Sequence, residues 1–473
     1  MTTRITAGSL QATTLMRLRN GFTAVLLSST LLTCRHPVTT PEAGSRQTVY
    51  KPPIAHAEKR VPAEWEPHES IWMAWPTYNN KHDWDAEATY VQLLKTLIAT
   101  VSVNLCVTDA AHAQQVRAYL QREGIASSEF GSRIHIRTVG YGDIWLRDTG
   151  PVYVQSGRQT MAVDFDFNCW GWGSFVKDPG FAGFIQREEG VDREIAKLTN
   201  ATPLKSSLIL EGGALEFNGK GTVIVSEDVV FQRNPAWSKV DVEAEFHRLF
   251  GTQKVIWLKG FVGNDAHPVI NAPYRMRLNG TVQSVYTLMT TNGHTDEFVR
   301  FTTSSTILLA KPPSAEEAAN DPIAARSRET LLEAQRLLSS ATDQDGNLLQ
   351  IQWMPETRSM FVTLDQQDEI CKLLTGLDYQ RVGKPNINRT KPITGVLAAS
   401  YLNYLVTNQL VLVAKYRDLD SGMAAADAEA VMVLRQAFPG RQVVAIDSRA
   451  INVGGGGIHC ITRQMPKPAE RAD

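Results

Sequence analysis

Short apolar runs alternate with amphipathic segments along the chain from about residue 60 onward. Apolar residues recur at helical spacing in several segments, and short apolar runs typical of strands lie between them. We predict helices at 86–99, 110–122, 239–249, 326–338 and 424–437. We predict strands at 101–107, 133–137, 254–258, 349–352, 409–414 and 442–446. This repeated order of strand and helix predicts an α/β fold.

No low-complexity linker interrupts residues 60–466, so we predict a single domain there, followed by a short tail at 467–473. One segment, 261–289, breaks the alternating rhythm. We interpret this segment as an insertion or as a lid-like hairpin. The length of the remaining chain is enough for one large hydrophobic core.

Residues 1–34 have the features of a secretory signal peptide. An apolar run at 22–32 follows two arginines and is too short to span a bilayer as a permanent helix. The sequence Leu-Leu-Thr-Cys that ends at Cys34 resembles a bacterial lipobox, so lipidation of Cys34 would anchor the chain to a membrane. Residues 35–59 are polar and contain proline, as expected of a tether. We expect an exported protein, periplasmic, envelope-anchored or secreted in a bacterium; the alternative is a disordered apolar tail.

Charge and cysteine content narrow the possible partners. The chain has 48 basic and 49 acidic residues and a formal net charge of -1, which gives no support for binding nucleic acid. The cysteines lie far apart and form no Cys-x-x-Cys pair, which argues against a structural zinc site and a disulfide framework. They are Cys34, Cys106, Cys169, Cys371 and Cys460.

The last of these cysteines is the first candidate for chemistry. Cys460 follows four glycines at 454–457, and glycine lets the backbone adopt open conformations and leaves room for a ligand. We expect little around this thiol to bury or pair it, which suits a nucleophile. The alternative is a buried structural cysteine after a flexible turn.

Two acidic residues lie beside turns that could line a pocket. Asp148 belongs to Trp-Leu-Arg-Asp-Thr-Gly-Pro at 145–151, where Trp145 supplies an aromatic wall. The alternative there is an exposed pair of Arg147 and Asp148, which would contribute little. Glu211 lies between an apolar strand and two glycines, where a simple turn is the alternative.

A histidine and an amide complete the set of candidates. His294 and Asp296 lie in Gly-His-Thr-Asp before an apolar run, and in an extended segment their side chains would point the same way. A histidine beside a carboxylate is suited to proton transfer, and metal binding is the less favoured alternative. Asn403 lies before the strand at 409–414, where turn residues are also common.

This combination suits a planar cation. Guanidinium donates paired hydrogen bonds to carboxylates, which would fix its plane and keep it cationic. A thiolate at Cys460 could attack the central carbon, and His294 could protonate the departing amine and then activate water. Acyl transfer would instead need oxyanion donors and has little use for several carboxylates. The residues therefore favour deimination.

The chain resembles the agmatine deiminases and bacterial peptidylarginine deiminases of the guanidino-group-modifying superfamily. Seven motifs occur in the order found in that family and extend over nearly all of 61–466. They lie at 62–69 with 72–76, 145–151, 210–213 with 221–222, 233–235, 293–296, 400–403 and 454–460.

The resemblance implies a fold and a set of roles. It implies a five-bladed, pseudo-symmetric α/β propeller with the site in its central channel, and a deiminase catalytic domain at 60–466. Cys460 would be the nucleophile and His294 the general acid and base. Asp148 and Asp296 would hold the guanidinium.

The remaining candidates would support these groups. Glu211 would support the histidine and substrate network, Asn403 would line the pocket, and Trp145 would contact the substrate. The resemblance implies no metal and no organic cofactor. The expected partner is a small guanidino compound, with no nucleic acid; the oligomeric state is open.

Agmatine is the expected substrate, hydrolysed to N-carbamoylputrescine and ammonia through a covalent thiouronium intermediate. The signal peptide and the long segment at 261–289 favour the alternative, arginine residues of exported peptides and proteins. An amidinotransferase and a non-catalytic guanidinium-binding lipoprotein are further alternatives. Release of ammonia in the absence of an amine acceptor would separate hydrolysis from amidino transfer.

Overall fold

The computed structural model describes residues 59–77, 85–179 and 181–468. Contacts divide the chain into residues 1–55 and 56–473, and everything described here belongs to the second unit. The predicted signal peptide, Cys34 and the tether lie outside the described residues, except Lys59, which begins strand β1 (Lys59–Arg60). Among the helices of the described part, none combines the length and the apolar character that crossing a membrane requires.

Five sheets in the described part of the chain share one topology: an antiparallel strand pair, then a helical crossover to a third strand parallel to the second. The first is β5 (Val152–Ser156), β6 (Gln159–Asp166), α4 (Phe181–Leu198) and β7 (Thr202–Ile209), with β1 on its edge. The second is β8 (Leu215–Phe217), β9 (Thr222–Ser226), helices α5 (Glu227–Arg233) and α6 (Lys239–Phe250), and β10 (Lys254–Leu258). The third is β13 (Val299–Phe301), β14 (Thr306–Ala310), helices α7 (Ala315–Asn320) and α8 (Pro322–Leu338), and β15 (Gln350–Met354).

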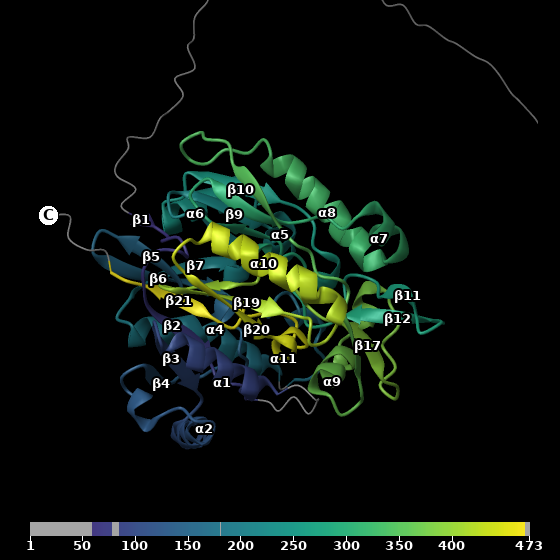
Figure 1. The fold of residues 1–473 in the computed structure, drawn as a ribbon, viewed down its shortest axis with the longest axis horizontal. Coiled ribbons are helices and arrows are strands. Elements are labelled where there is room, and N and C mark those ends of the chain that lie inside the picture. The colour runs from purple at the N-terminus through teal and green to yellow at the C-terminus, as the bar shows by residue number, and fades with distance from the viewer. Residues whose placement is uncertain (1–58, 78–84, 180, 469–473) are drawn as a thin grey trace, which may run out of the picture. The chain divides into compact units, whose positions relative to one another are not determined.

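The last two of these sheets join the two ends of the described domain. The fourth is β18 (Leu405–Val406), β19 (Leu410–Lys415), α10 (Ala424–Ala437) and β20 (Gln442–Asp447). The fifth is β21 (Arg463–Pro466), β2 (His68–Ala74), α1 (Ala86–Leu97) and β3 (Ser102–Val107), extended by α2 (Ala110–Arg122) and β4 (Ile134–Thr138). The yellow strand β21 pairs antiparallel with β2 (Figure 1), so the C-terminal strand completes a sheet begun near residue 68.

Local sequence explains where the helices begin and end. The Asp85 carboxylate accepts hydrogen bonds from the first amides of α1, and Ser238 forms a capping box with Asp241 at the start of α6. Gly251 ends α6 in the left-handed region at φ 69°, which glycine adopts without strain. The predicted helices at 110–122 and 424–437 match α2 and α10 residue for residue. Helix α8 begins at Pro322, earlier than predicted, because Asp321 caps it and proline fits the first turn.

The segment 261–289 contains a hairpin that is built into a sheet. Strands β11 (Tyr274–Leu278) and β12 (Thr281–Thr287) form the hairpin, and β12 also pairs in parallel with β17 (Ile393–Val396). The sheet ends with β16 (Phe361–Leu364), which precedes helix α9 (Glu369–Gly376). Asp265 and His267, earlier in the segment, are buried. The predicted hairpin is therefore confirmed, and the segment as a whole belongs to the packed domain.

Candidate active site

One segment from each of the five similar sheets reaches the same place in the molecule. Each candidate residue lies just before the first strand of its sheet: Asp148 before β5, Glu211 before β8, His294 and Asp296 before β13, Asn403 before β18 and Cys460 before β21. The repeated topology thus explains why residues far apart in sequence converge. The structure brings all of these predicted residues together.

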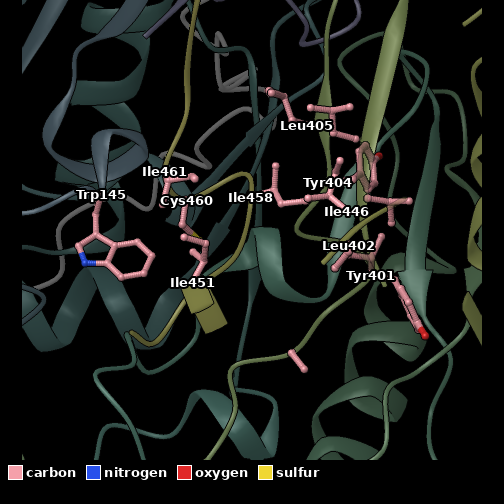
Figure 2. Close-up of a cluster of buried hydrophobic side chains, with 14 of the residues drawn as sticks. Trp145, Tyr401, Leu402, Tyr404, Leu405, Ile446, Ile451, Ile458, Cys460 and Ile461 are labelled. Carbon is pink, nitrogen blue, oxygen red and sulfur yellow. The ribbon is translucent and has the colours of Figure 1, made fainter. Parts of the chain in front are cut away.

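The Cys460 thiol is buried, with 6% of the residue exposed. Asn403 Nδ2 donates to Sγ at 3.0 Å, and Glu297 Oε1 and Asp296 Oδ2 lie 3.7 and 3.9 Å from Sγ. Figure 2 shows Cys460 among buried apolar side chains, including Ile461. Burial, followed by the charges of Asp296 and Glu297, raises the thiol pKa well above its usual value. The expectation of an unburied thiol was wrong, because the glycine loop packs closely against its neighbours.

The glycines allow close packing of side chains rather than open space. A Cβ at Gly456 would lie 2.7 Å from the Trp145 ring and 3.0 Å from Sγ, and a Cβ at Gly457 would lie 2.6 Å from Asn403 Oδ1. Gly455 has φ 108°, and its missing side chain makes room for the carbonyl of Met289. These contacts fix the loop that carries the thiol and set it against the Trp145 ring.

The His294 imidazole is buried between two carboxylates. Nε2 lies 3.5 Å from Glu211 Oε2, and Nδ1 lies 3.8 Å from Asp148 Oδ1. Burial disfavours the charged ring, but the negative charges of Asp148 and Glu211 outweigh it and raise the pKa of His294 to about 9. At neutral pH the ring is therefore an imidazolium and can donate a proton.

The two flanking carboxylates are held by donors. Glu211 Oε1 accepts from Arg233 Nε at 3.1 Å, and both side chains are fully buried. Burial opposes ionisation of Glu211, but Arg233 and His294 together outweigh it, so the pKa of Glu211 is lowered. Asp148 accepts from Trp170 Nε1 at 2.8 Å and from the Gly213 amide at 2.9 Å, while burial raises the pKa of Asp148.

Asp296 faces the thiol rather than lying on a strand with His294. Thr295–Glu297 form a 3-10 turn, so the predicted extended segment was wrong. Asp296 Oδ2 contacts His459 Nδ1 at 2.6 Å. Burial opposes ionisation, but this contact together with the charges of His294 and Arg300 outweighs it and lowers the pKa of Asp296. Asp296 is thus ionised beside Cys460.

Several buried groups at the site were missed by sequence reasoning. The Asp265 carboxylate accepts from the amides of Thr291, Gly293 and His294 at 2.7, 2.6 and 3.1 Å, and so fixes the loop that carries His294. Asp265 lies in a stretch with no periodic pattern, so nothing in the sequence distinguished it. His459 directly precedes Cys460, which was the available signal for it.

Two further buried residues at the site, Glu297 and Arg147, were less distinct in the sequence. Glu297 accepts from Asn403 Nδ2 at 2.8 Å and was not among the predicted site residues. Burial, followed by the charge of Asp296, raises the pKa of Glu297 well above its usual value. Arg147 is buried and pairs with Glu64 at 2.8 Å, so the alternative of an exposed pair with Asp148 was wrong.

Asp296, Glu297 and Cys460 offer ligand atoms that all lie within 4.8 Å of one another, so these three could hold a metal ion. The N–H groups of His459 and Asn403 already point at the same oxygens and sulfur. A cation would compete with these donors for the same lone pairs. Hydrogen bonding to the protein therefore accounts for the cluster as it stands.

Cys460 and Asp148 line a cavity of about 660 Å³, a size typical of ligand pockets. Aromatic side chains make up much of its wall, and charged side chains lie elsewhere along it. The aromatic residues are Trp145, Trp170, Trp172, Phe181 and Phe184. The charged residues are Asp143, Lys177, Asp178, Glu369, Lys372 and Arg389.

Comparisons with known proteins agree with this geometry. An agmatine deiminase from Pseudomonas aeruginosa (strain UCBPP-PA14) is 29% identical over 422 residues, covering 86% of this chain and 96% of the relative. An agmatine deiminase from Ectopseudomonas mendocina (strain ymp) is 30% identical over 421 residues, covering 86% and 95%. The structure of the agmatine deiminase of Enterococcus faecalis is similar, with a TM-score of 0.64, 23% identity, and coverage of 87% of this chain and 97% of that one.

The family pattern for Porphyromonas-type peptidyl-arginine deiminases matches residues 60–287 and 282–466. Together these two matches extend from β1 to the end of β21, and therefore include every candidate residue of the site. The α/β fold predicted from the sequence is confirmed by the structure and by its likeness to the Enterococcus faecalis enzyme. The chain belongs to the Porphyromonas-type peptidyl-arginine deiminase family.

Proposed function

We propose that the chain is a hydrolytic deiminase that converts agmatine and water to N-carbamoylputrescine and ammonium. One observation carries the proposal: a thiol and a carboxylate line one cavity, with an imidazolium next to that carboxylate and an ionised carboxylate next to the thiol. The curated relatives that are 29% and 30% identical over most of their length are agmatine deiminases, which favours agmatine among guanidino compounds. The aromatic walls of the cavity suit the aliphatic chain of this substrate.

Binding of the guanidinium prepares the thiol. Asp148 and Asp296 are proposed to accept hydrogen bonds from its nitrogens, and Trp145 borders the cavity beside them. The negative charges that raise the thiol pKa are then offset by the cation, so Cys460 loses its proton when substrate binds. Asn403 Nδ2 donates to the resulting thiolate, which lies 3.0 Å away.

The thiolate adds to the central carbon and gives a neutral tetrahedral adduct. His294, protonated at neutral pH, donates its proton to one amino group, and the C–N bond breaks to release ammonia and a thiouronium cation. The neutral His294 then takes a proton from water as the oxygen attacks the same carbon. Glu211 holds the ring and favours its return to the charged form.

Collapse of the second adduct breaks the C–S bond and releases the ureido product. The hydroxyl proton of this adduct returns to the sulfur, and the thiol proton lost on binding leaves with ammonia as ammonium. The overall change is therefore a guanidinium and a water to a ureido compound and an ammonium ion. The roles of Cys460, His294, Asp148, Asp296, Glu211 and Asn403 in this scheme are part of the proposal.

We propose that the five similar sheets form a five-bladed, pseudo-symmetric propeller around the site. The support is their shared topology and the position of each candidate residue just before the first strand of its sheet. Pairing of β21 with β2 would close the ring.

Peptidyl arginine is the second candidate substrate. The cavity of about 660 Å³ is larger than agmatine requires, and Lys177, Lys372 and Arg389 along it could meet carbonyl or carboxylate groups. The family description names peptidyl-arginine deiminases. A ureido-product assay on agmatine, free arginine and an arginine peptide separates these substrates. We expect turnover of agmatine above the other two; no product from any of the three would refute the proposed function.

The covalent step has its own test. The Cys460→Ala variant should bind agmatine without turnover, and the unaltered protein should show a mass increase on the peptide containing Cys460 when quenched during turnover. Ammonia release without any amine acceptor would exclude amidino transfer. Full turnover by Cys460→Ala would exclude covalent catalysis.

We further propose that the protein is exported and that Cys34 is lipidated. The support is the apolar run at 22–32 and the lipobox-like sequence ending at Cys34. Metabolic labelling with an alkyne fatty acid, compared between the full chain and Cys34→Ser, tests this. Label on the full chain alone is expected; equal absence of label in both would refute lipidation.

A further inference from the structure

A line of ionic contacts reaches Asp296 through His459. Asp296 Oδ2 contacts His459 Nδ1 at 2.6 Å, and His459 Nε2 contacts Glu64 Oε1 at 2.8 Å. The side chains of Asp296 and His459 are 1% exposed and that of Glu64 is 21% exposed. Glu64 belongs to the motif at 62–69, which the proposed reaction has so far not used.

Two buried arginines hold Glu64 in its charged form. Arg147 Nη1 contacts Glu64 Oε1 at 2.8 Å, and Arg300 Nη2 contacts the other oxygen. Arg300 also pairs with Glu216 through Nε at 2.9 Å. Burial opposes ionisation of Glu64, but the arginines outweigh it and lower the pKa of Glu64. The far end of the line is therefore an anchored carboxylate.

The proton count of this line follows from its geometry. A neutral imidazole donates through only one nitrogen, yet both ring nitrogens of His459 lie within hydrogen-bonding distance of carboxylate oxygens. The shorter contact places an N–H toward Asp296. Burial, followed by the charges of Arg147 and Arg300, lowers the pKa of His459, so the one N–H of a neutral ring is the donor to Asp296. The line thus delivers a donor to Asp296, and the two arginines satisfy the carboxylate at its other end.

We propose that His459 and Glu64 are positioning residues for Asp296, which keep its carboxylate ionised and oriented toward the guanidinium before the substrate arrives. The inference rests on the proposed function only for the identity of that cation. A purely structural role would affect the stability of the fold. It would leave the charge of Asp296, and hence the acidity of the neighbouring thiol, unchanged.

The acidity of Cys460 reports the charge of Asp296 without any substrate. Asp296 Oδ2 lies 3.9 Å from Sγ, and the other negative groups that raise the thiol pKa are Glu297 and Asp148. His294 and Arg300 also face Asp296 and favour its charge. In His459→Leu, the buried carboxylate loses its donor and takes up a proton. The thiol then becomes more acidic, by about one pH unit or more for the loss of a charge at this distance.

The experiment measures the rate at which iodoacetamide labels Cys460 as a function of pH, with the labelled peptide identified by mass spectrometry. The midpoint of this curve should move to lower pH by about one unit or more in His459→Leu. It should move less in His459→Gln, whose amide can still donate to Asp296. Glu64→Gln should shift it in the same direction as His459→Leu, because the anchor has lost its charge.

Glu66→Gln is the matched control. Glu66 lies in the same motif and pairs with Arg60 at 2.6 Å, with 28% of its side chain exposed. This variant should leave the midpoint unchanged. Cys106, which is 0% exposed, is an internal control, because its labelling reports loosening of the fold.

An unchanged midpoint in His459→Leu, with Cys106 still protected, would overturn the inference. If His459→Leu unfolds and exposes Cys106, the Glu64→Gln variant decides: an unshifted midpoint there overturns the inference as well. Because the labelling needs no substrate, this result is independent of whether the unaltered protein deiminates agmatine.

Discussion

Nε2 of His294 lies 3.5 Å from Oε2 of Glu211, and within the described residues neither atom has a hydrogen-bond partner. Both side chains are almost completely buried. This separation is a little longer than a hydrogen bond, so a small movement of the ring on substrate binding would close it. Together with Asp148, Glu211 raises the pKa of His294 and so extends the pH range in which the ring keeps its proton.

The first prediction concerns activity and pH. The pKa of His294 is raised to about 9, so kcat/KM should fall as pH rises through about 9, where the proton donor is lost. Glu211→Gln removes a charge that favours the imidazolium and should move this alkaline limb to lower pH. The control is Glu216→Gln, which alters another buried carboxylate paired with an arginine and should leave the limb in place. If the alkaline limb lies at the same pH in the unaltered protein and in both variants, the assignment of the limb to His294 is contradicted.

The raised pKa of His294 should also make the free energy of unfolding depend on pH. A histidine whose folded pKa is raised from about 6.5 to about 9 stabilises the fold fully below about pH 6.5. This contribution is lost as pH rises through about 9. Urea unfolding at a series of pH values should show the loss in the unaltered protein. His294→Gln, which does not titrate, should lack it.

Substitution of Asn403 should lower the reactivity of the Cys460 thiol more than it lowers the stability of the fold. Its amide donates to Sγ at 3.0 Å, and its oxygen accepts from the amide of His459 at 2.9 Å. Asn403→Asp replaces the donor by a negative charge, so we expect kcat/KM to fall by about 10²–10³-fold, as for the loss of one stabilising donor. The matched control is Asn408→Asp, which alters an amide bound to the backbone of His68. A comparable loss of activity in this control would indicate a general structural effect.

Asp265 holds the loop that carries His294, so its substitution should affect both stability and turnover. Asp265→Asn replaces an oxygen that accepts backbone N–H groups by a donor, and we expect a loss of about 3 kcal/mol in the free energy of unfolding together with lower kcat. Asp343→Asn is the control, because Asp343 is also buried and accepts from the backbone amides of a turn, at Asp345 and Asn347. That variant should lose stability and keep kcat. Denaturant unfolding and steady-state kinetics on both variants make the comparison.

The glycine loop permits a test of close packing. Gly455 has φ 108° and a Cβ there would collide with the Met289 carbonyl, whereas Gly440 has φ 84° and nothing within 4 Å of its Cβ position. Gly440→Ala should cost about 1 kcal/mol from backbone strain alone. Gly455→Ala should cost about 3 kcal/mol and lower kcat, because strain and collision add. Thermal unfolding that shows equal losses for the two variants would contradict the packing argument.

The sequence pattern was sufficient to predict helices and strands, and to find the site residues whose side chains are chemically distinctive. Helices α2 and α10 were predicted residue for residue because their apolar spacing and flanking turns are local properties. Cys460 and His294 were found because a thiol after glycines and a histidine near a carboxylate are rare combinations. The turn at Asp296 was missed because one tight turn leaves no periodic signal.

The long-range contacts could not be predicted in this way. His459 and Glu64 are 395 positions apart, and only pairing of the terminal sheet brings them together. Asp265 accepts hydrogen bonds from backbone amides, which every residue type provides, so its partners have no sequence signature. The burial of Cys460 also depends on these distant neighbours rather than on its own loop.

The pairing of β21 with β2 has a consequence for how the protein matures. Cys460 lies just before the strand that pairs last in sequence, and the neighbouring His459 contacts Glu64. During synthesis the ribosome would release almost the whole domain before this strand could dock. A nascent chain would therefore carry the walls of the pocket without a fixed nucleophile. Deimination would begin only after the two ends of the domain have met.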